Sequence, residues 1–91
     1  MIFYHGTTQE GWDFVQQQGF LIYPRATEQN PNISPVVYLA TNIEEAKKHG
    51  EIVLKVDYDP TINPGKNNYN PHCWQLRVYE PIDLLKIKKL L

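Results

Sequence analysis

The chain has 91 residues, a hydrophobic content of 42%, a charged content of 21% and a formal net charge of −1 at pH 7. This length excludes more than one ordinary domain, and the composition excludes a disordered chain. The small net charge argues against a domain whose main task is to bind nucleic acid by electrostatics. We therefore expect a single globular domain over residues 1–91.

The first segment has the pattern of a strand followed by a helix. Ile2 to His5 predicts a short strand, and Thr7 lies three residues before Glu10, which is the capping-box spacing at a helix start. Gly19 is the natural end of that helix, because glycine readily closes helices in the left-handed conformation. The residues expected to point inward from the helix are Trp12, Phe14 and Val15.

An apolar run, a long loop and a buried strand are expected next. Residues 20–23 are apolar and are expected to be extended. Residues 24–35 contain Pro, Asn, Gln, Ser and Thr without periodicity, which predicts a loop, and loops of about a dozen residues are often functional covers. Residues 36–40 are a β-branched and aromatic run, which predicts a buried strand.

A second helix follows, capped by Thr41 and Asn42 and ended by Gly50. Acidic residues in its first turn and basic residues in its last turn suit the helix dipole at both ends. These charged residues are Glu44, Glu45, Lys47, Lys48 and His49.

The remaining sequence predicts three more strands. Residues 52–57 alternate apolar and polar side chains, as in a strand with one wetter face. Residues 59–71 predict a loop, residues 73–79 a strand, and residues 84–91 a final strand or a short helix. The order of these elements predicts an α+β domain with two helices packed on mainly antiparallel sheet.

Positive charge is concentrated near the end of the sequence, in Arg77, Lys86, Lys88 and Lys89. Basic residues on an edge strand more often prevent edge-to-edge aggregation than form a binding site. An exposed last strand over residues 84–91 is also expected to allow pairing in a homodimer.

The single cysteine, Cys73, excludes an intrachain disulfide and suits a reducing compartment. No apolar run is long enough to cross a membrane, and no secretion signal is recognised, so we expect a cytoplasmic protein without membrane contact. The spacing of His5, His49 and His72 matches no zinc template, so no metal site is expected.

Two short strings hold the candidate functional side chains: Tyr-His-Gly-Thr at residues 4–7 and Val-Tyr-Leu-Ala at residues 37–40. Each is expected to end a strand, which would bring the imidazole of His5 near the phenol of Tyr38. Taken alone, a histidine or a tyrosine in such a position is more often structural than functional. Gly6 permits a sharp turn or the close approach of a ligand. We predict that the two rings line a common cleft.

Together with Glu-Ala at residues 45–46 and Trp-Gln-Leu-Arg-Val-Tyr at residues 74–79, these strings resemble the three signature blocks of the ADP-ribosyltransferase fold. The nearest pattern is that of the poly(ADP-ribose) polymerase and diphtheria-toxin group, and the RNA 2'-phosphotransferases share the His-Gly-Thr block. The resemblance covers nearly the whole chain. It implies a minimal ADP-ribosyltransferase-like fold of two small, mainly antiparallel sheets and two helices, with NAD bound as substrate in a cleft between the sheets.

The resemblance also implies roles for single residues. His5 would hydrogen-bond the nicotinamide-side ribose of NAD, Gly6 would bind the nicotinamide amide through its backbone, and Thr7 would support the ribose contact. Tyr38 would stack on the nicotinamide ring, and His49 falls near the family's second stacking aromatic.

The chain departs from the family at the catalytic glutamate, because the matching position is Gln75, so the implied triad is His5, Tyr38 and Gln75. Glutamine can hydrogen-bond a ribose hydroxyl, but it is neutral and cannot act as a base. The resemblance then implies mono-ADP-ribosyl transfer to an unknown protein or nucleic-acid acceptor, or a catalytically inactive module that binds a nucleotide or a protein. Two other hypotheses remain. One is RNA 2'-phosphotransferase-like activity, for which Arg25 and Arg77 are the obvious cations, and the other is an α+β domain without a nucleotide site.

Overall fold

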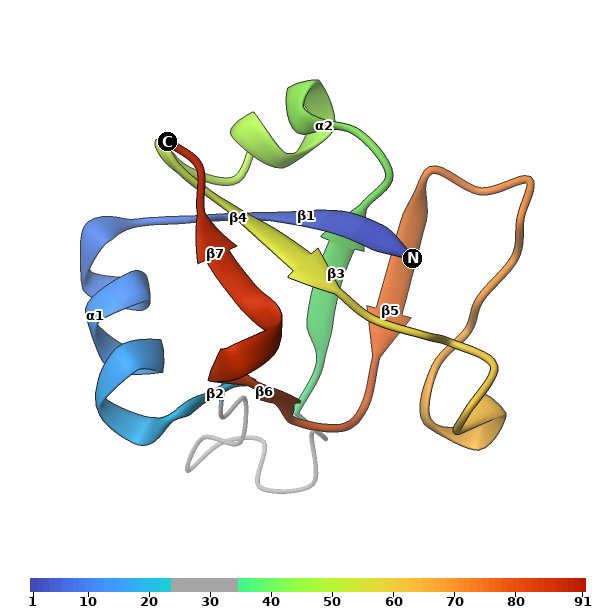
Figure 1. The fold of residues 1–91 in the computed structure, drawn as a ribbon. Helices are drawn as coiled ribbons and strands as arrows, with labels where there is room; N and C mark the ends of the chain where they lie inside the picture. The colour runs from blue at the N-terminus through green and yellow to red at the C-terminus, as the bar shows by residue number, and fades with distance from the viewer. Residues whose placement is uncertain (24–34) are drawn as a thin grey trace, which may run out of the picture.

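The structure is a computed structural model that describes residues 1–23 and 35–91. It has the predicted α+β class, with one five-stranded and one two-stranded antiparallel sheet and two helices (Figure 1). The larger sheet has the strand order β5-β3-β1-β4-β7, and the smaller sheet pairs β2 with β6. The strands are β1 (Ile2–Thr7), β2 (Phe20–Leu21), β3 (Val37–Ala40), β4 (Ile52–Asp57), β5 (Gln75–Val78), β6 (Ile82–Asp83) and β7 (Ile87–Lys89). The helices are α1 (Gln9–Gln18) and α2 (Ile43–Lys47), with 3₁₀ turns η1 (Pro64–Lys66) and η2 (Leu84–Lys86).

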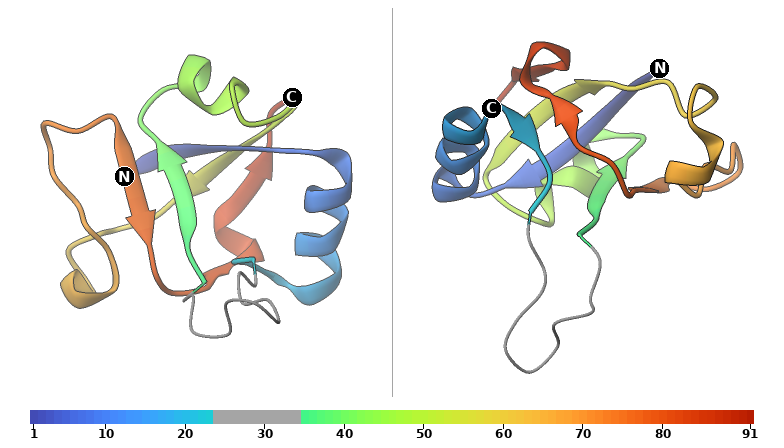
Figure 2. Two further views of the ribbon diagram at one scale, coloured as in Figure 1. Left: turned by 180° about the vertical axis from the view of Figure 1, so that it is seen from behind. Right: turned by 90° about the horizontal axis from the view of Figure 1, so that it is seen from below.

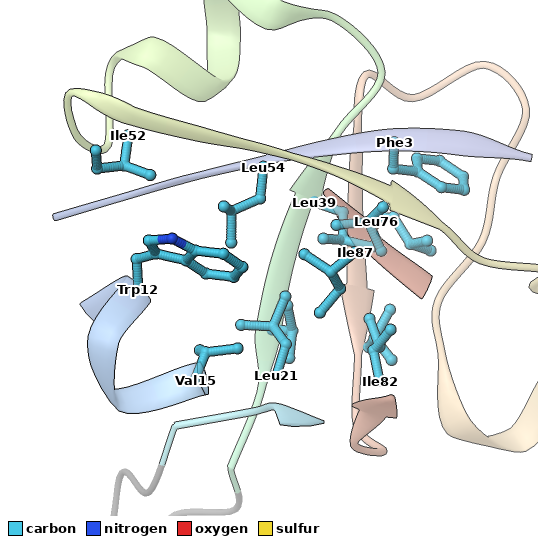
Figure 3. Packing of buried hydrophobic residues seen from close by; sticks show 13 residues of the cluster. Phe3, Trp12, Val15, Leu21, Leu39, Ile52, Leu54, Leu76, Ile82 and Ile87 are labelled. Atoms are coloured by element: carbon cyan, nitrogen blue, oxygen red, sulfur yellow. The ribbon is translucent and has the colours of Figure 1, made fainter. Parts of the chain in front are cut away.

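The main hydrophobic core lies on one face of the five-stranded sheet and is closed by α1 and by the β2–β6 pair. Figure 3 shows Trp12 and Val15 of α1 lying against Leu54 of β4 and Leu21 of β2. Alternate residues of each strand supply this core, because successive side chains of a strand point to opposite faces. Burial of one such side chain, for example the fully buried Leu54, stabilises the fold by roughly 1.5–3 kcal/mol.

Helix α1 begins one residue later than the sequence predicts. Thr7 is the last residue of β1, and Thr8 is the N-cap, whose Oγ1 accepts a hydrogen bond from the Gly11 N–H at 3.1 Å. The predicted capping box at Thr7 is therefore wrong. Gly19 ends the helix as predicted, in the left-handed conformation with φ 87°.

Of the three residues expected to point inward from α1, Trp12 and Val15 are buried, whereas Phe14 is 40% exposed. A short amphipathic helix buries residues three or four positions apart, and Trp12 and Val15 form that stripe. The Phe14 ring instead stacks on the ring of Tyr23, with the ring centroids 6.2 Å apart.

Helix α2 packs on the opposite face of the five-stranded sheet, over one end of β1, β3 and β4 (Figures 1 and 2). Asn42 is its N-cap as predicted, with Oδ1 accepting a hydrogen bond from the Glu45 N–H at 2.9 Å. Ala46 is buried between the helix and the sheet. The helix ends at Lys47, so His49 lies in the turn that follows it and not in the last helical turn.

Strands β1 and β3 pair over a short distance only. β1 pairs with β4 along its whole length, but its register with β3 is limited to Tyr4 opposite Ala40. Figures 1 and 2 show β3 running at a large angle to β1. The two strands therefore separate between Gly6 and Tyr38, next to α2.

The longer connections differ in how far the structure describes them. Of the predicted loop 24–35, all but Pro35 lies outside the described residues. The predicted loop 59–71 is held by Tyr58, whose Oη donates to Glu80 Oε2 at 2.9 Å and accepts from Asn67 Nδ2 at 3.2 Å. The final segment contains both predicted alternatives, the η2 turn and the β7 strand. No helix in the described part of the chain is long and apolar enough to span a bilayer.

Candidate functional site

Four of the six predicted site residues, Gly6, Tyr38, His49 and Gln75, line one hollow beside α2. We call it the Tyr38 hollow. Its volume of ≈ 10 Å³ is about the space that a single water molecule needs. The other residues that line it are Tyr4, Leu39, Ala40, Ala46 and Trp74.

The register of the sheet brings these residues together. Tyr4 of β1 lies directly opposite Ala40 of β3, and Ala40 lies opposite Gln75 of β5. Tyr38 is two residues before Ala40, so its side chain points to the same face of the sheet. The predicted burial of the whole β3 run is wrong for Tyr38, which is 40% exposed, because α2 does not extend over this end of β3.

Gly6 directs its backbone polar groups towards the hollow. It lies opposite Val53 of β4, whose N–H donates to the Leu91 carbonyl at 3.2 Å and whose carbonyl accepts from the Leu90 N–H at 2.8 Å. Both backbone groups of Val53 therefore point away from β1, towards the chain that follows β7. In an antiparallel pair of this type, the polar groups of the two residues point away from each other. The N–H and C=O of Gly6 consequently point away from β4, towards β3 and the Tyr38 hollow.

Packing also requires glycine at this position. A Cβ built on Gly6 would lie 1.7 Å from the backbone oxygen of Ala46 and 3.3 Å from the Cβ of His49. Backbone conformation is not the reason, since Gly19 is the described residue with a positive φ. The absence of a side chain at Gly6 lets α2 lie directly on β1.

His5 and Thr7 lie on the opposite face of β1, so the prediction that the rings of His5 and Tyr38 share a cleft is wrong. Both residues are buried, with 8% exposure each. They alternate along the strand with Tyr4 and Gly6, and successive residues of a strand face opposite sides. His5 reaches Tyr38 through the backbone only, because its Nδ1–H donates to the Tyr38 carbonyl at 2.8 Å.

Tyr23 completes a buried polar group with these two residues. Because a carbonyl can only accept, Nδ1 of His5 carries the ring proton and Nε2 is left as the acceptor. The Tyr23 hydroxyl donates towards this Nε2 over 3.4 Å and accepts from the Thr7 hydroxyl at 3.2 Å. Burial lowers the pKa of His5, against the opposing effect of the hydrogen bond to Tyr38. His5 is therefore a neutral structural link between β1 and β3.

Sequence reasoning gave no site role to Tyr23 or to five residues that line the hollow: Tyr4, Leu39, Ala40, Ala46 and Trp74. No local pattern indicates that Tyr23 reaches back to β1 or that Ala46 of α2 packs on Gly6, because tertiary packing places both. Trp74 precedes Gln75, and strict strand alternation would send the two side chains to opposite faces. The strand β5 begins only at Gln75, so Trp74 is free of that alternation and lines the same hollow.

The Tyr38 hollow offers aromatic surface and neutral hydrogen-bonding groups. Within the described residues, its lining contains no Asp, Glu, Lys or Arg. Glu80, the carboxylate that follows Gln75 most closely in sequence, instead binds the Tyr58 hydroxyl and Asn63 Nδ2. The described ranges also contain no group of three or more His, Cys, Asp or Glu side chains placed to hold a metal ion. Such a lining suits a planar ring with an amide better than it suits proton transfer by a carboxylate.

Comparison of the chain with protein-family models, with curated proteins and with solved structures finds no match. A functional assignment therefore rests on the geometry of the hollow and on the resemblance of the sequence blocks that form it.

Proposed function

We propose that this chain is an ADP-ribosyltransferase-like domain that binds NAD with the nicotinamide ring in the Tyr38 hollow. One observation carries the proposal: Gly6, Tyr38, His49 and Gln75, which come from four separate parts of the chain, surround a single hollow. Gly6, Tyr38 and His49 are three of the residues to which the resemblance gives contacts with the nicotinamide end of NAD, and Gln75 occupies the position of the family's catalytic glutamate. Their convergence supports a shared ligand.

The groups around the hollow match the chemistry of nicotinamide. The primary amide of nicotinamide has N–H donors and a carbonyl acceptor, and the backbone of Gly6 presents one acceptor and one donor in return. Tyr38 presents a half-exposed ring on which a pyridine can stack. Gln75 supplies an amide on the same face that can hydrogen-bond a ribose hydroxyl.

Binding of a ring requires the hollow to open, because its present volume of ≈ 10 Å³ holds about one water molecule. We expect the exposed side chains of Trp74 and His49 to swing outward. A shift of α2 is a less favourable route, since its Ala46 packs directly on Gly6.

His5 takes a different part in this proposal from the one that the resemblance implies. Its Nδ1–H holds the carbonyl of Tyr38 and thereby fixes the backbone that carries the stacking ring. It acts as a positioning residue, and Thr7 acts with it through Tyr23.

Gln75 determines whether we propose NAD binding alone or ADP-ribosyl transfer as well. Cleavage of the nicotinamide–ribose bond develops positive charge on the ribose, which a nearby carboxylate would stabilise. The described lining of the hollow has no carboxylate, so we propose NAD binding without efficient transfer. Mono-ADP-ribosyl transfer to a protein or nucleic-acid acceptor is the alternative. The RNA 2'-phosphotransferase reading has less support, because no Lys or Arg lines the described hollow and Arg25 lies outside the described residues.

Thermal unfolding with and without NAD tests the binding. A single ligand at a hundred times its dissociation constant stabilises the fold by about 2.7 kcal/mol, or roughly 10–20 °C for a domain of this size. Tyr38→Ala should abolish the shift, whereas Tyr79→Ala, which removes a ring of similar exposure elsewhere, should retain it. No shift in the native protein, or equal shifts in both variants, would overturn the proposal.

Mass spectrometry of released nicotinamide tests transfer. We expect little release from the native protein and increased release from Gln75→Glu. Release by the native protein at a comparable rate would favour the mono-ADP-ribosyltransferase alternative.

A homodimer is a further proposal. Strand β7 is at an edge of the five-stranded sheet, so a second copy pairing along it would continue the sheet. Sedimentation velocity over a range of protein concentrations tests this: a single monomer species at all concentrations would exclude it.

A further inference from the structure

One row of directly opposed residues crosses all five strands on the α2 face of the larger sheet. The row runs Lys88, Lys55, Tyr4, Ala40, Gln75, and each residue is the register partner of the next. Side chains of directly opposed residues point to the same face of a sheet. At about 4.8 Å between neighbouring strands, the row measures roughly 19 Å from Lys88 to Gln75, and its last three residues line the Tyr38 hollow.

The basic end of this row borders a second hollow, of ≈ 270 Å³, which we call the lysine groove. Its lining residues are Lys55, Lys86, Lys88, Ile2, Leu85 and Asp57. Lys55 and Lys88 are directly opposed, an arrangement that destabilises a sheet when the two charges are alike. Within the described residues, no salt bridge involves the three lysines, and Asp57 lies 3.6 Å from the amino group of Met1.

Protection of the sheet edge does not account for this charge. Such protection requires basic residues on the edge strand, and Lys88 and Lys89 of β7 provide them. Lys55 belongs to β4, an interior strand, and is partly buried. Two lysines in this arrangement would be favoured by an anion bound between them.

We propose that this face of the sheet binds single-stranded nucleic acid, with phosphates in the lysine groove and bases stacked on aromatic rings towards the Tyr38 hollow. Tyr4 lies in the middle of the row, and Trp74, which is 47% exposed, lies at its far end. A positively charged groove next to exposed aromatic rings is the arrangement by which proteins bind single strands without sequence preference.

The rings favour nucleic acid over other polyanions. An acidic peptide or an anionic lipid surface would be attracted by the lysines but would make no use of the exposed rings of Tyr38 and Trp74. The net charge of −1 does not oppose the proposal, because three lysines and one carboxylate line the groove while most acidic residues lie elsewhere. This binding does not require NAD. Under the alternative of mono-ADP-ribosyl transfer, the single strand would be the acceptor.

Fluorescence anisotropy of a labelled single-stranded oligonucleotide of about twelve nucleotides, titrated with the full chain without NAD, tests the proposal. Each neutralised phosphate of a single strand contributes about 0.7 to the slope of log affinity against log salt. Three lysine contacts therefore predict about an 18-fold loss of affinity between about 50 mM and about 200 mM salt.

Two matched double variants locate the contacts. Lys55→Gln/Lys88→Gln should leave one contact and reduce that salt-dependent loss to about threefold. Lys66→Gln/Lys89→Gln makes the same change in net charge, but Lys89 has the strand parity of the buried Ile87 and faces away from the groove. This control should retain the 18-fold loss. Trp74→Ala should weaken binding at least about fivefold at fixed salt and leave the salt slope unchanged.

Each alternative occupant has its own outcome. The proposal is overturned if the native protein does not bind the oligonucleotide at about 50 mM salt, or if both double variants lose the same affinity. Equal affinity for duplex and single-stranded DNA would show that base stacking on the aromatic rings does not contribute, and would overturn that part of the proposal. Binding of polyglutamate or of phosphatidylserine vesicles at least as tight as that of the oligonucleotide, and insensitive to Trp74→Ala, would assign the face to a peptide or a membrane instead. Because no arm contains NAD, these failures leave the proposed NAD site standing.

Discussion

Gly6→Ala tests the contact that positions both β1 and α2. The new Cβ would lie 1.7 Å from the Ala46 carbonyl oxygen, and the two atoms must separate by about 1.3 Å to reach 3.0 Å, the lower limit for real Cβ contacts. The obstacle is backbone, so the whole helix must move. Overpacking of this kind destabilises a fold by up to about 3 kcal/mol. Alanine also lowers the conformational entropy of the unfolded chain, which stabilises the fold by about 0.4–1 kcal/mol. We expect a net destabilisation of about 2 kcal/mol, which lowers the melting temperature by roughly 8–16 °C.

Urea denaturation followed by circular dichroism measures this change, and Gly65→Ala is the matched control. Gly65 has no atom within 4 Å of a built Cβ and no positive φ. Its replacement should be neutral or should stabilise the fold by about 0.4–1 kcal/mol. If Gly6→Ala lies within about 0.5 kcal/mol of the native protein, the tight packing of α2 on β1 is refuted.

Two further predictions concern polar side chains that are hydrogen-bonded within the fold. Burial lowers the pKa of His5 from 6.5, so the unfolded chain binds a proton at this residue more readily than the folded chain does. The free energy of unfolding should therefore be unaffected by His5 above about pH 6.5. Below that pH it should fall by at most about 1.4 kcal/mol per pH unit. Urea midpoints measured from about pH 7.5 to about pH 5.5 should show this loss in the native protein and in the control variant His72→Gln. The same loss in His5→Gln, which lacks the buried imidazole, would contradict the prediction. Tyr58→Phe removes hydrogen bonds to Glu80 and Asn67 and should cost about 1 kcal/mol in urea denaturation, whereas an equal cost from the exposed Tyr79→Phe would rule out this explanation.

Local patterns predicted much of the fold. Gly19 and Asn42 act at helix ends as expected, because caps depend on neighbouring backbone groups and on little else. The alternation in residues 52–57 also holds: Leu54 faces the main core and Lys55 the opposite face, since the two-residue period of a strand is a property of its backbone.

Local patterns could not predict which face of β1 meets which partner. The period of the strand requires His5 and Gly6 to face opposite sides, but only the packing of α2 decides that the Gly6 side borders the Tyr38 hollow. The partner of His5 is a backbone carbonyl of Tyr38, which no side-chain pattern encodes. The prediction therefore placed both strings at the ends of strands, but it ended the first strand two residues early and gave His5 the wrong neighbours.

An NMR titration of the ¹⁵N-labelled protein with NAD tests the central claim most directly, because it reports on the two faces of β1 separately. Binding of the nicotinamide end in the Tyr38 hollow predicts that the amide signals of Gly6, Ala46 and Gln75 and the indole N–H signal of Trp74 shift together and saturate. Unchanged signals at these positions, or shifts confined to His5, Thr7 and Tyr23 on the opposite face, would contradict the assignment of the hollow.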